Sequence, residues 1–140
     1  MGRFLNELRL IAEPGPRHTR PLWRLLSPLA YQVGDDVCGF VVVVPADFVT
    51  DLASVPRPFW RIVPICDEEY REPVVVHDWL CTAYPKVSRR VADAILYDAM
   101  RVKGCCAFHL LTVYYGVRFG ATWYAMWRRI GRLFGRESHE

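Results

Sequence analysis

Two helix-forming segments joined by one short break, between residues 71 and 104, constrain the fold more than any other stretch. Pro73 suits the first turn of the first segment, where its missing amide costs nothing, and Pro85 ends that segment. Ser88 is a favoured N-cap residue for the second segment, and Gly104 suits the left-handed position after a helix C-terminus. The stretch therefore predicts an antiparallel helix pair with a tight loop.

His77 and Asp93 lie on different helices of this predicted pair. If the chain turns near Lys86, His77 lies about nine residues before the turn and Asp93 about seven after it. At ~3.6 residues per turn the two side chains then face each other to within roughly half a turn. A carboxylate beside a histidine fixes the imidazole tautomer and shifts its pKa, so these two are the candidate catalytic residues. A structural interpretation stays open, in which His77 is a core residue and Asp93 pairs with Arg89.

Two further carboxylates are candidate ligands of a divalent metal such as calcium or zinc. Asp78 follows His77 directly, and Asp51 lies in a loop that leaves the N-terminal segments. The alternative for Asp51 is a local turn, because aspartate side chains often accept hydrogen bonds from amides just ahead of them. A cleft that opens these residues to solvent would favour chemistry, whereas full burial with every polar atom paired would favour a structural network.

The N-terminal third of the sequence predicts a small antiparallel sheet. Residues 4–12 and 22–33 form extended segments, and Pro28 confines the second to an edge or a bend. Residues 37–44 form the clearest strand, because the run is continuous and β-branched. Its unbroken apolarity predicts burial on both faces.

The segment from Cys105 to Gly135 is the most apolar part of the chain and predicts a long amphipathic C-terminal helix. Arg118 lies in the middle of the apolar window. An arginine at the centre of a membrane-spanning helix costs ~2.5–3.5 kcal/mol, so a helix packed on the domain is favoured over a membrane span. Peripheral membrane contact through this helix stays open. No recognised DNA- or RNA-binding motif accompanies its arginines, so we expect no specific nucleic-acid partner.

The length and composition of the chain indicate that these elements form one domain. A chain of 140 residues can bury a core, and 52% hydrophobic content argues against disorder. We predict an α+β fold, with a single domain at residues 1–135 and a disordered tail at 136–140. The predicted core residues are Val41, Val43, Val75, Leu80, Ile95, Leu96 and Leu110. Five cysteines without metal-type spacing predict buried thiols in a reducing compartment, and we identify no signal peptide.

Three blocks of the sequence resemble a known family. Residues 48–60 (FVTDLASVPRPFW), 74–80 (VVVHDWL) and 89–100 (RRVADAILYDAM) are similar, in order and spacing, to the phage and prophage proteins called DUF1353. The resemblance implies a bacteriophage or prophage origin and a location in the bacterial host cytoplasm or in the virion. It implies no established chemistry. Cys81 stands where the family pattern favours tyrosine.

The helix pair is also similar to the active-site helices of the secreted phospholipases A2. In that family the histidine activates a water, the adjacent aspartate holds calcium and the second-helix aspartate orients the histidine. The matching positions are His77, Asp78 and Asp93, but the glycine-rich calcium loop and the disulfides are missing. Two hypotheses follow. One is a phage-encoded hydrolase with a His-Asp site, and the other is a non-enzymatic virion or host-interaction protein that binds phage or host proteins.

Overall fold

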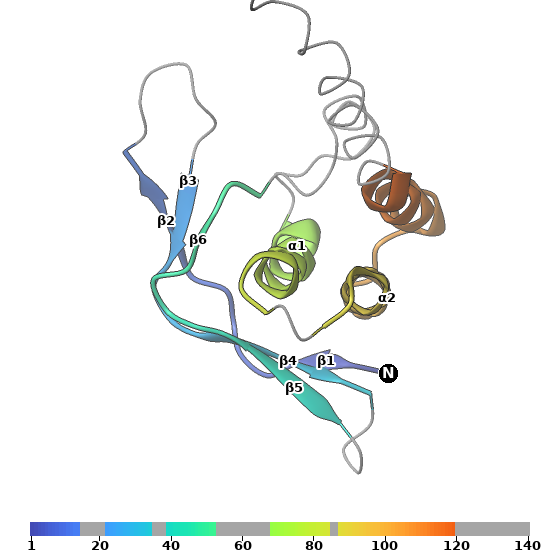
Figure 1. Cartoon of the computed structure of the whole chain (residues 1–140), viewed down its shortest axis with the longest axis horizontal. Coiled ribbons are helices and arrows are strands. Elements are labelled where there is room, and N and C mark those ends of the chain that lie inside the picture. The colour runs from blue at the N-terminus through green and yellow to red at the C-terminus, as the bar shows by residue number, and fades with distance from the viewer. Residues whose placement is uncertain (15–21, 35–38, 53–67, 85–86, 120–140) are drawn as a thin grey trace, which may run out of the picture.

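The computed structural model describes residues 1–14, 22–34, 39–52, 68–84 and 87–119 (Figure 1). Within these residues six short strands come first, β1 (Arg3–Phe4), β2 (Leu10–Glu13), β3 (Leu22–Leu25), β4 (Leu29–Val33), β5 (Phe40–Val44) and β6 (Val49–Thr50). The helices α1 (Glu68–Thr82) and α2 (Arg89–Val102) follow, and residues 107–119 are also helical. The predicted α+β class is confirmed.

The described strands form two three-stranded antiparallel sheets, in the orders β1-β4-β5 and β2-β3-β6. The chain passes from β3 in one sheet to β4 in the other at the predicted interruption around Pro28. Asp47, in the turn before β6, has φ 66°, a left-handed conformation that aspartate tolerates. Leu25 at the end of β3 forms backbone hydrogen bonds with Asp47 and Phe48 at 2.9 and 3.0 Å. These bonds hold the turn against the junction of the two sheets.

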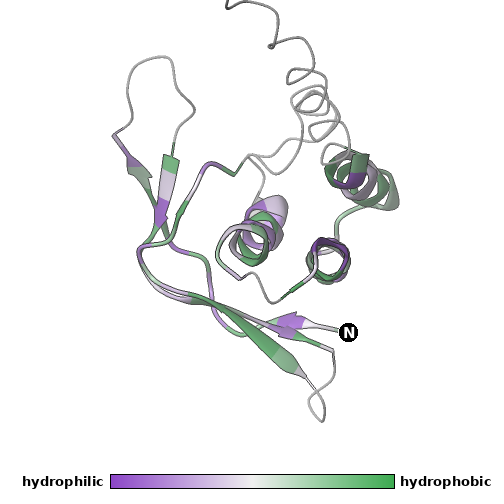
Figure 2. Cartoon of the chain, viewed as in Figure 1, coloured by the Kyte–Doolittle hydropathy of each residue, from purple (hydrophilic) through white to green (hydrophobic). Residues whose placement is uncertain are grey.

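Strand β5 is buried on one face only, which corrects the prediction of burial on both faces. Val42 and Val44 are buried, whereas Val41 and Val43 are 41% and 52% exposed and are not core residues. The labelled helices lie on one side of the β1-β4-β5 sheet, and β5 stands out as an apolar strand in Figure 2. Because side chains alternate along a strand, every second valine points to the uncovered side.

The main core lies where α1 and α2 pack on the β1-β4-β5 sheet. Helix α1 contacts β4 and β5, while α2 contacts β1 and β4 and lies beside α1. The other predicted core residues are all buried, namely Val75, Leu80, Ile95, Leu96 and Leu110. The last two belong to a second cluster, formed by α1, α2 and the helix at residues 107–119.

A close backbone approach holds the N-terminal end of the chain against α2. The N–H of Gly2 donates to Asp98 Oδ2 at 3.0 Å, and the Tyr31 hydroxyl donates to the same oxygen at 2.7 Å. A Cβ atom on Gly2 would lie 2.1 Å from the Tyr31 hydroxyl oxygen, so only glycine fits there. One carboxylate thus joins α2 to the start of the chain and to β4.

Pro73 lies inside α1, which corrects its predicted place in the first turn, because the helix is already formed at Glu68. A proline inside a helix removes the amide that would bond the carbonyl four residues earlier, here that of Glu69. The Cys105 thiol donates to that carbonyl at 3.8 Å. A donor from another part of the chain therefore replaces the missing amide.

Both ends of α2 follow their sequence signals. The Ser88 hydroxyl oxygen accepts a backbone N–H of the first turn at 3.4 Å, as predicted for an N-cap residue. At the other end Gly104 has φ 81°, as predicted. The N–H groups of Gly104 and Cys105 donate to the carbonyls of Arg101 and Met100 at 3.0 and 3.1 Å. This paired arrangement is the Schellman motif, and it leads the chain into the next helix.

The helix at residues 107–119 buries Leu110, Val113 and Val117. Its predicted continuation to residue 135, and the predicted tail at 136–140, lie outside the described residues. Within the described ranges, no helix combines the length and the apolarity that crossing a membrane requires.

The described cysteines differ in exposure. Cys105 is buried, as the sequence predicts, whereas Cys81 and Cys106 are exposed, which corrects the expectation of buried thiols. Cys81 lies on the solvent side of α1, and Cys106 directly precedes the helix at residues 107–119. The packing of the neighbouring elements leaves both thiols exposed.

We expect Cys105→Ala to lower the free energy of unfolding by about 1–2 kcal/mol, because it removes a buried sulfur from the second core cluster and the hydrogen bond of its thiol to the Glu69 carbonyl. Cys106→Ala is the matched control, since Cys106 is adjacent and exposed, and it should change stability by no more than about 0.5 kcal/mol. Urea denaturation of both variants beside the parent measures the difference. Equal stability of the two variants would remove the role assigned to the Cys105 thiol.

Candidate functional site

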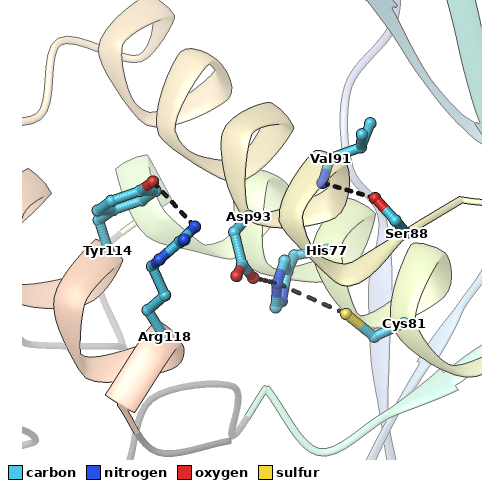
Figure 3. A network of polar contacts seen from close by, with 7 residues as sticks. All are labelled: His77, Cys81, Ser88, Val91, Asp93, Tyr114 and Arg118. Atoms are coloured by element: carbon cyan, nitrogen blue, oxygen red, sulfur yellow. Dashed lines mark hydrogen bonds and ion pairs between the residues drawn. The ribbon is translucent and has the colours of Figure 1, made fainter.

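His77 on α1 and Asp93 on α2 are in direct contact, as the spacing around the helix turn predicts (Figure 3). His77 Nε2 lies 2.9 Å from Asp93 Oδ1. Three consecutive buried valines, Val74 to Val76, precede the histidine, and buried Ala92 precedes the aspartate. The apolar faces of the two helices therefore bring the pair into the helix interface.

The two nitrogens of the His77 ring have different surroundings. The side chains of His77 and Asp93 are only 2% and 3% exposed. Nε2 is held by Asp93, but Nδ1 is buried and has no hydrogen-bond partner among the residues that the structure describes. Leaving a buried polar atom unpaired costs about 1–3 kcal/mol. Burial of the pair fits a structural network, whereas the unpaired Nδ1 does not.

Opposing effects act on the pKa of His77. Burial lowers the pKa, because desolvation disfavours the charged imidazolium. Hydrogen bonds to Asp93 and Cys81, with the charges of Cys81 and Asp78, act in the other direction and raise the pKa to about 9. The ring is therefore the charged imidazolium at neutral pH, and its Nε2–H donates to Asp93.

Cys81 is a site residue whose contact with His77 was not predicted. Its Sγ lies 3.5 Å from His77 Nε2, one helical turn along α1 (Figure 3), and the side chain is exposed. The four-residue spacing of a histidine and a cysteine on one helix was the signal that identifies such a contact. Because Sγ and Asp93 Oδ1 approach the same nitrogen, the thiol shares one ring atom with the carboxylate and leaves Nδ1 open.

Asp78 is bonded to the loop that follows β6. The Thr50 hydroxyl donates to Asp78 Oδ2 at 2.6 Å and accepts the N–H of Leu52 at 3.1 Å. Leu52 has φ 52°, a left-handed conformation that costs a residue other than glycine on the order of 1–3 kcal/mol. Thr50 therefore holds a strained backbone segment against α1, one residue from His77. Sequence reasoning assigned the local turn to Asp51 and missed this threonine.

The predicted metal ligands are not joined into a metal site by the described residues. Asp51 is exposed, and Asp78 is bonded to Thr50. In the described ranges, no group of three or more His, Cys, Asp or Glu side chains could hold a metal ion. The predicted calcium or zinc site is therefore without support there. Residues 53–60, the remainder of the first sequence block, lie outside the described residues.

Comparison with known proteins agrees with the resemblance of the three sequence blocks. The model of a family described as "Protein of unknown function (DUF1353)" matches residues 23–117, which is more than half of the chain. An uncharacterized protein, y4jT of Sinorhizobium fredii (strain NBRC 101917 / NGR234), is 29% identical over 107 residues. That match covers 74% of this chain and 30% of the relative, so the chain spans less than a third of the relative's length. No solved structure matches the chain.

We expect the stability of the protein to fall as the pH rises from about 6.5 to about 9. The folded protein keeps a proton on His77 that the unfolded chain releases in this window, because the folded-state pKa is raised from 6.5 to about 9. The stabilisation is fully present below pH 6.5 and is lost as the pH passes 9. At 1.36 kcal/mol per pKa unit the total is roughly 3 kcal/mol.

Asp93→Asn should flatten this decline, because it removes the carboxylate that favours the imidazolium. Glu7→Gln, which removes an exposed carboxylate elsewhere, is the control and should keep the slope of the parent. Urea midpoints measured across the pH window give the three slopes. A slope that Asp93→Asn leaves unchanged would contradict the assignment to His77.

Proposed function

We propose that this chain, which belongs to the DUF1353 family, is a hydrolase in which His77 acts as the general base. Asp93 orients the imidazole through Nε2, and Nδ1 is the atom that accepts a proton from the attacking water. The proposed reaction is the addition of water to an electrophilic carbonyl carbon, as in ester hydrolysis.

The Nδ1 atom of His77, which has no partner within the described part of the chain, carries this proposal. Buried polar atoms are nearly always hydrogen bonded, so a structural histidine would gain stability by pairing both nitrogens. In a histidine that acts as a general base, the two ring nitrogens have different roles: one is held by an orienting group and the other faces the reacting molecule. Asp93 at Nε2 and the unpaired Nδ1 fit these two roles.

The chemistry follows from this division of roles. Nδ1 takes one proton from water as the water oxygen bonds to the carbonyl carbon, and the Asp93 carboxylate stabilises the imidazolium that forms. The proton then passes to the leaving alkoxide as its C–O bond breaks, which regenerates the imidazole. Because the pKa of His77 is raised to about 9, the basic form becomes more abundant with pH, so the rate should rise up to about pH 9.

The resemblance to the secreted phospholipases A2 supports the same roles for His77 and Asp93. It also implies calcium at Asp78, which the described residues do not support, so calcium is left out of the proposal. The phage or prophage setting implied by the DUF1353 resemblance is part of the proposal. The matching family is described only as one of unknown function.

A non-enzymatic role is the second candidate, and the burial of the pair favours it. At 2% and 3% exposure, His77 and Asp93 tie α1 to α2 as core residues would in a virion or host-interaction protein. Breaking a buried charged pair costs roughly 3–5 kcal/mol. A simple deletion such as His77→Ala therefore destabilises the protein under both hypotheses and does not distinguish them.

Two amide variants separate the hypotheses, because each imitates one nitrogen of the ring. His77→Gln places an amide N–H near the position of Nε2 and so keeps a donor for Asp93, but it provides no base at Nδ1. His77→Asn places its amide near the position of Nδ1 and loses the contact with Asp93. We expect His77→Gln to remain folded and to hydrolyse p-nitrophenyl butyrate at least ~100-fold more slowly than the parent. His77→Asn should lose both activity and stability.

Release of p-nitrophenol, followed beside thermal melts of the same samples, measures both effects. Assays with added calcium and with a chelator show whether a metal takes part. A folded His77→Gln variant that matches the parent rate would exclude His77 as the base. Absence of hydrolysis by the folded parent, together with an unchanged melting temperature of His77→Gln, would favour the non-enzymatic role.

A further inference from the structure

The helix at residues 107–119 presents apolar side chains to solvent along one face. Phe108, Leu111, Tyr115 and Phe119 are 64%, 46%, 51% and 67% exposed. They recur at spacings of three and four residues, so they share one face of the helix. The rings of Tyr115 and Phe119 stack with their centroids 6.1 Å apart. We call these four residues the aromatic stripe, and the helix that carries them is largely apolar in Figure 2.

The aromatic stripe is not the face that packs on the rest of the protein. Leu110, Val113 and Val117 are buried on the opposite side, in the cluster shared with α1 and α2. The amphipathic pattern predicted for this segment requires a polar outer face, and the stripe occupies most of that face instead. A helix that is apolar on two faces has a second surface to bury.

The part of the sequence that contains the aromatic stripe is rich in basic residues. Residues 99–136 contain seven Arg or Lys residues and no Asp or Glu, although the whole chain has 18 basic and 15 acidic residues. The other residues therefore carry 11 basic and 15 acidic side chains, so the two parts have opposite net charge. Arg118 beside the stripe and Arg101 at the end of α2 are both exposed. An apolar surface in a segment without carboxylates is complementary to an anionic, partly apolar partner.

We propose that the aromatic stripe binds the surface of an anionic lipid bilayer. Aromatic and aliphatic side chains enter the boundary between headgroups and acyl chains, while Arg and Lys side chains contact the anionic headgroups. A nucleic-acid duplex would use the charge but would leave the stripe without an apolar partner, because its base faces are stacked on each other. A second copy of this chain would place like charges opposite each other. This inference is independent of the hydrolase proposal.

Vesicle binding by the full chain tests the proposal. The probes are vesicles of phosphatidylcholine with 30% phosphatidylserine, vesicles of phosphatidylcholine alone, and a short DNA duplex. We expect binding to the anionic vesicles to be at least tenfold tighter than binding to the neutral ones. The double variant Phe108→Gln, Tyr115→Gln should bind the anionic vesicles at least ~10-fold more weakly, because it removes inserted apolar area. Arg118→Gln should weaken binding about fivefold.

Val43→Gln is the matched control, because Val43 is an apolar residue of similar exposure, 52%, on the outer face of β5. Its vesicle affinity should stay within about twofold of the parent, and thermal melts should show all variants folded. Equal binding to neutral and anionic vesicles would overturn the proposal, as would full binding by the double variant. Tight binding to the duplex without vesicle binding, or a dimer that only the double variant dissociates, would overturn it as well.

Discussion

The hydrogen bond between His77 and Asp93 crosses the interface on which the packing of the helices depends. Two ionisable groups in that interface are tolerated because each compensates the desolvation of the other. Helix α1 is tied along its length to three other parts of the chain: Glu69 to Cys105, His77 to Asp93, and Asp78 to Thr50. The position of α1 between the sheets and the other helices therefore rests on polar contacts as well as on its buried valines.

The features that the sequence predicts correctly depend on short-range physics. The Ser88 cap and the left-handed Gly104 require only a few neighbouring residues. The meeting of His77 and Asp93 follows from helix periodicity once one tight turn is assumed, because two short antiparallel helices have few alternative registers. Much of the α+β fold and the central pair of the site were therefore accessible from local signals.

The features that were missed depend on contacts between distant residues. The apolar run in β5 does not reveal how many layers cover the sheet, and so Val43 was placed in the core although it is exposed. Pro73 is accepted inside α1 because a thiol from the loop after α2 bonds the freed carbonyl. The unpaired Nδ1 depends on the orientation of one ring, which no spacing rule determines. Strain at Leu52 likewise appears only once the Thr50 hydroxyl is in place.

The hydrogen bond from Gly2 to Asp98 limits the order in which the chain can fold during synthesis. Its partners are 96 residues apart in the sequence. The residue that precedes β1 therefore leaves the ribosome well before its carboxylate partner on α2. Until α1 has been made, the inner faces of β4 and β5 have no helix to cover them. The nascent chain therefore exposes the apolar strand faces until the helices follow, and the contact between Gly2 and Asp98 forms only after α2 has been made.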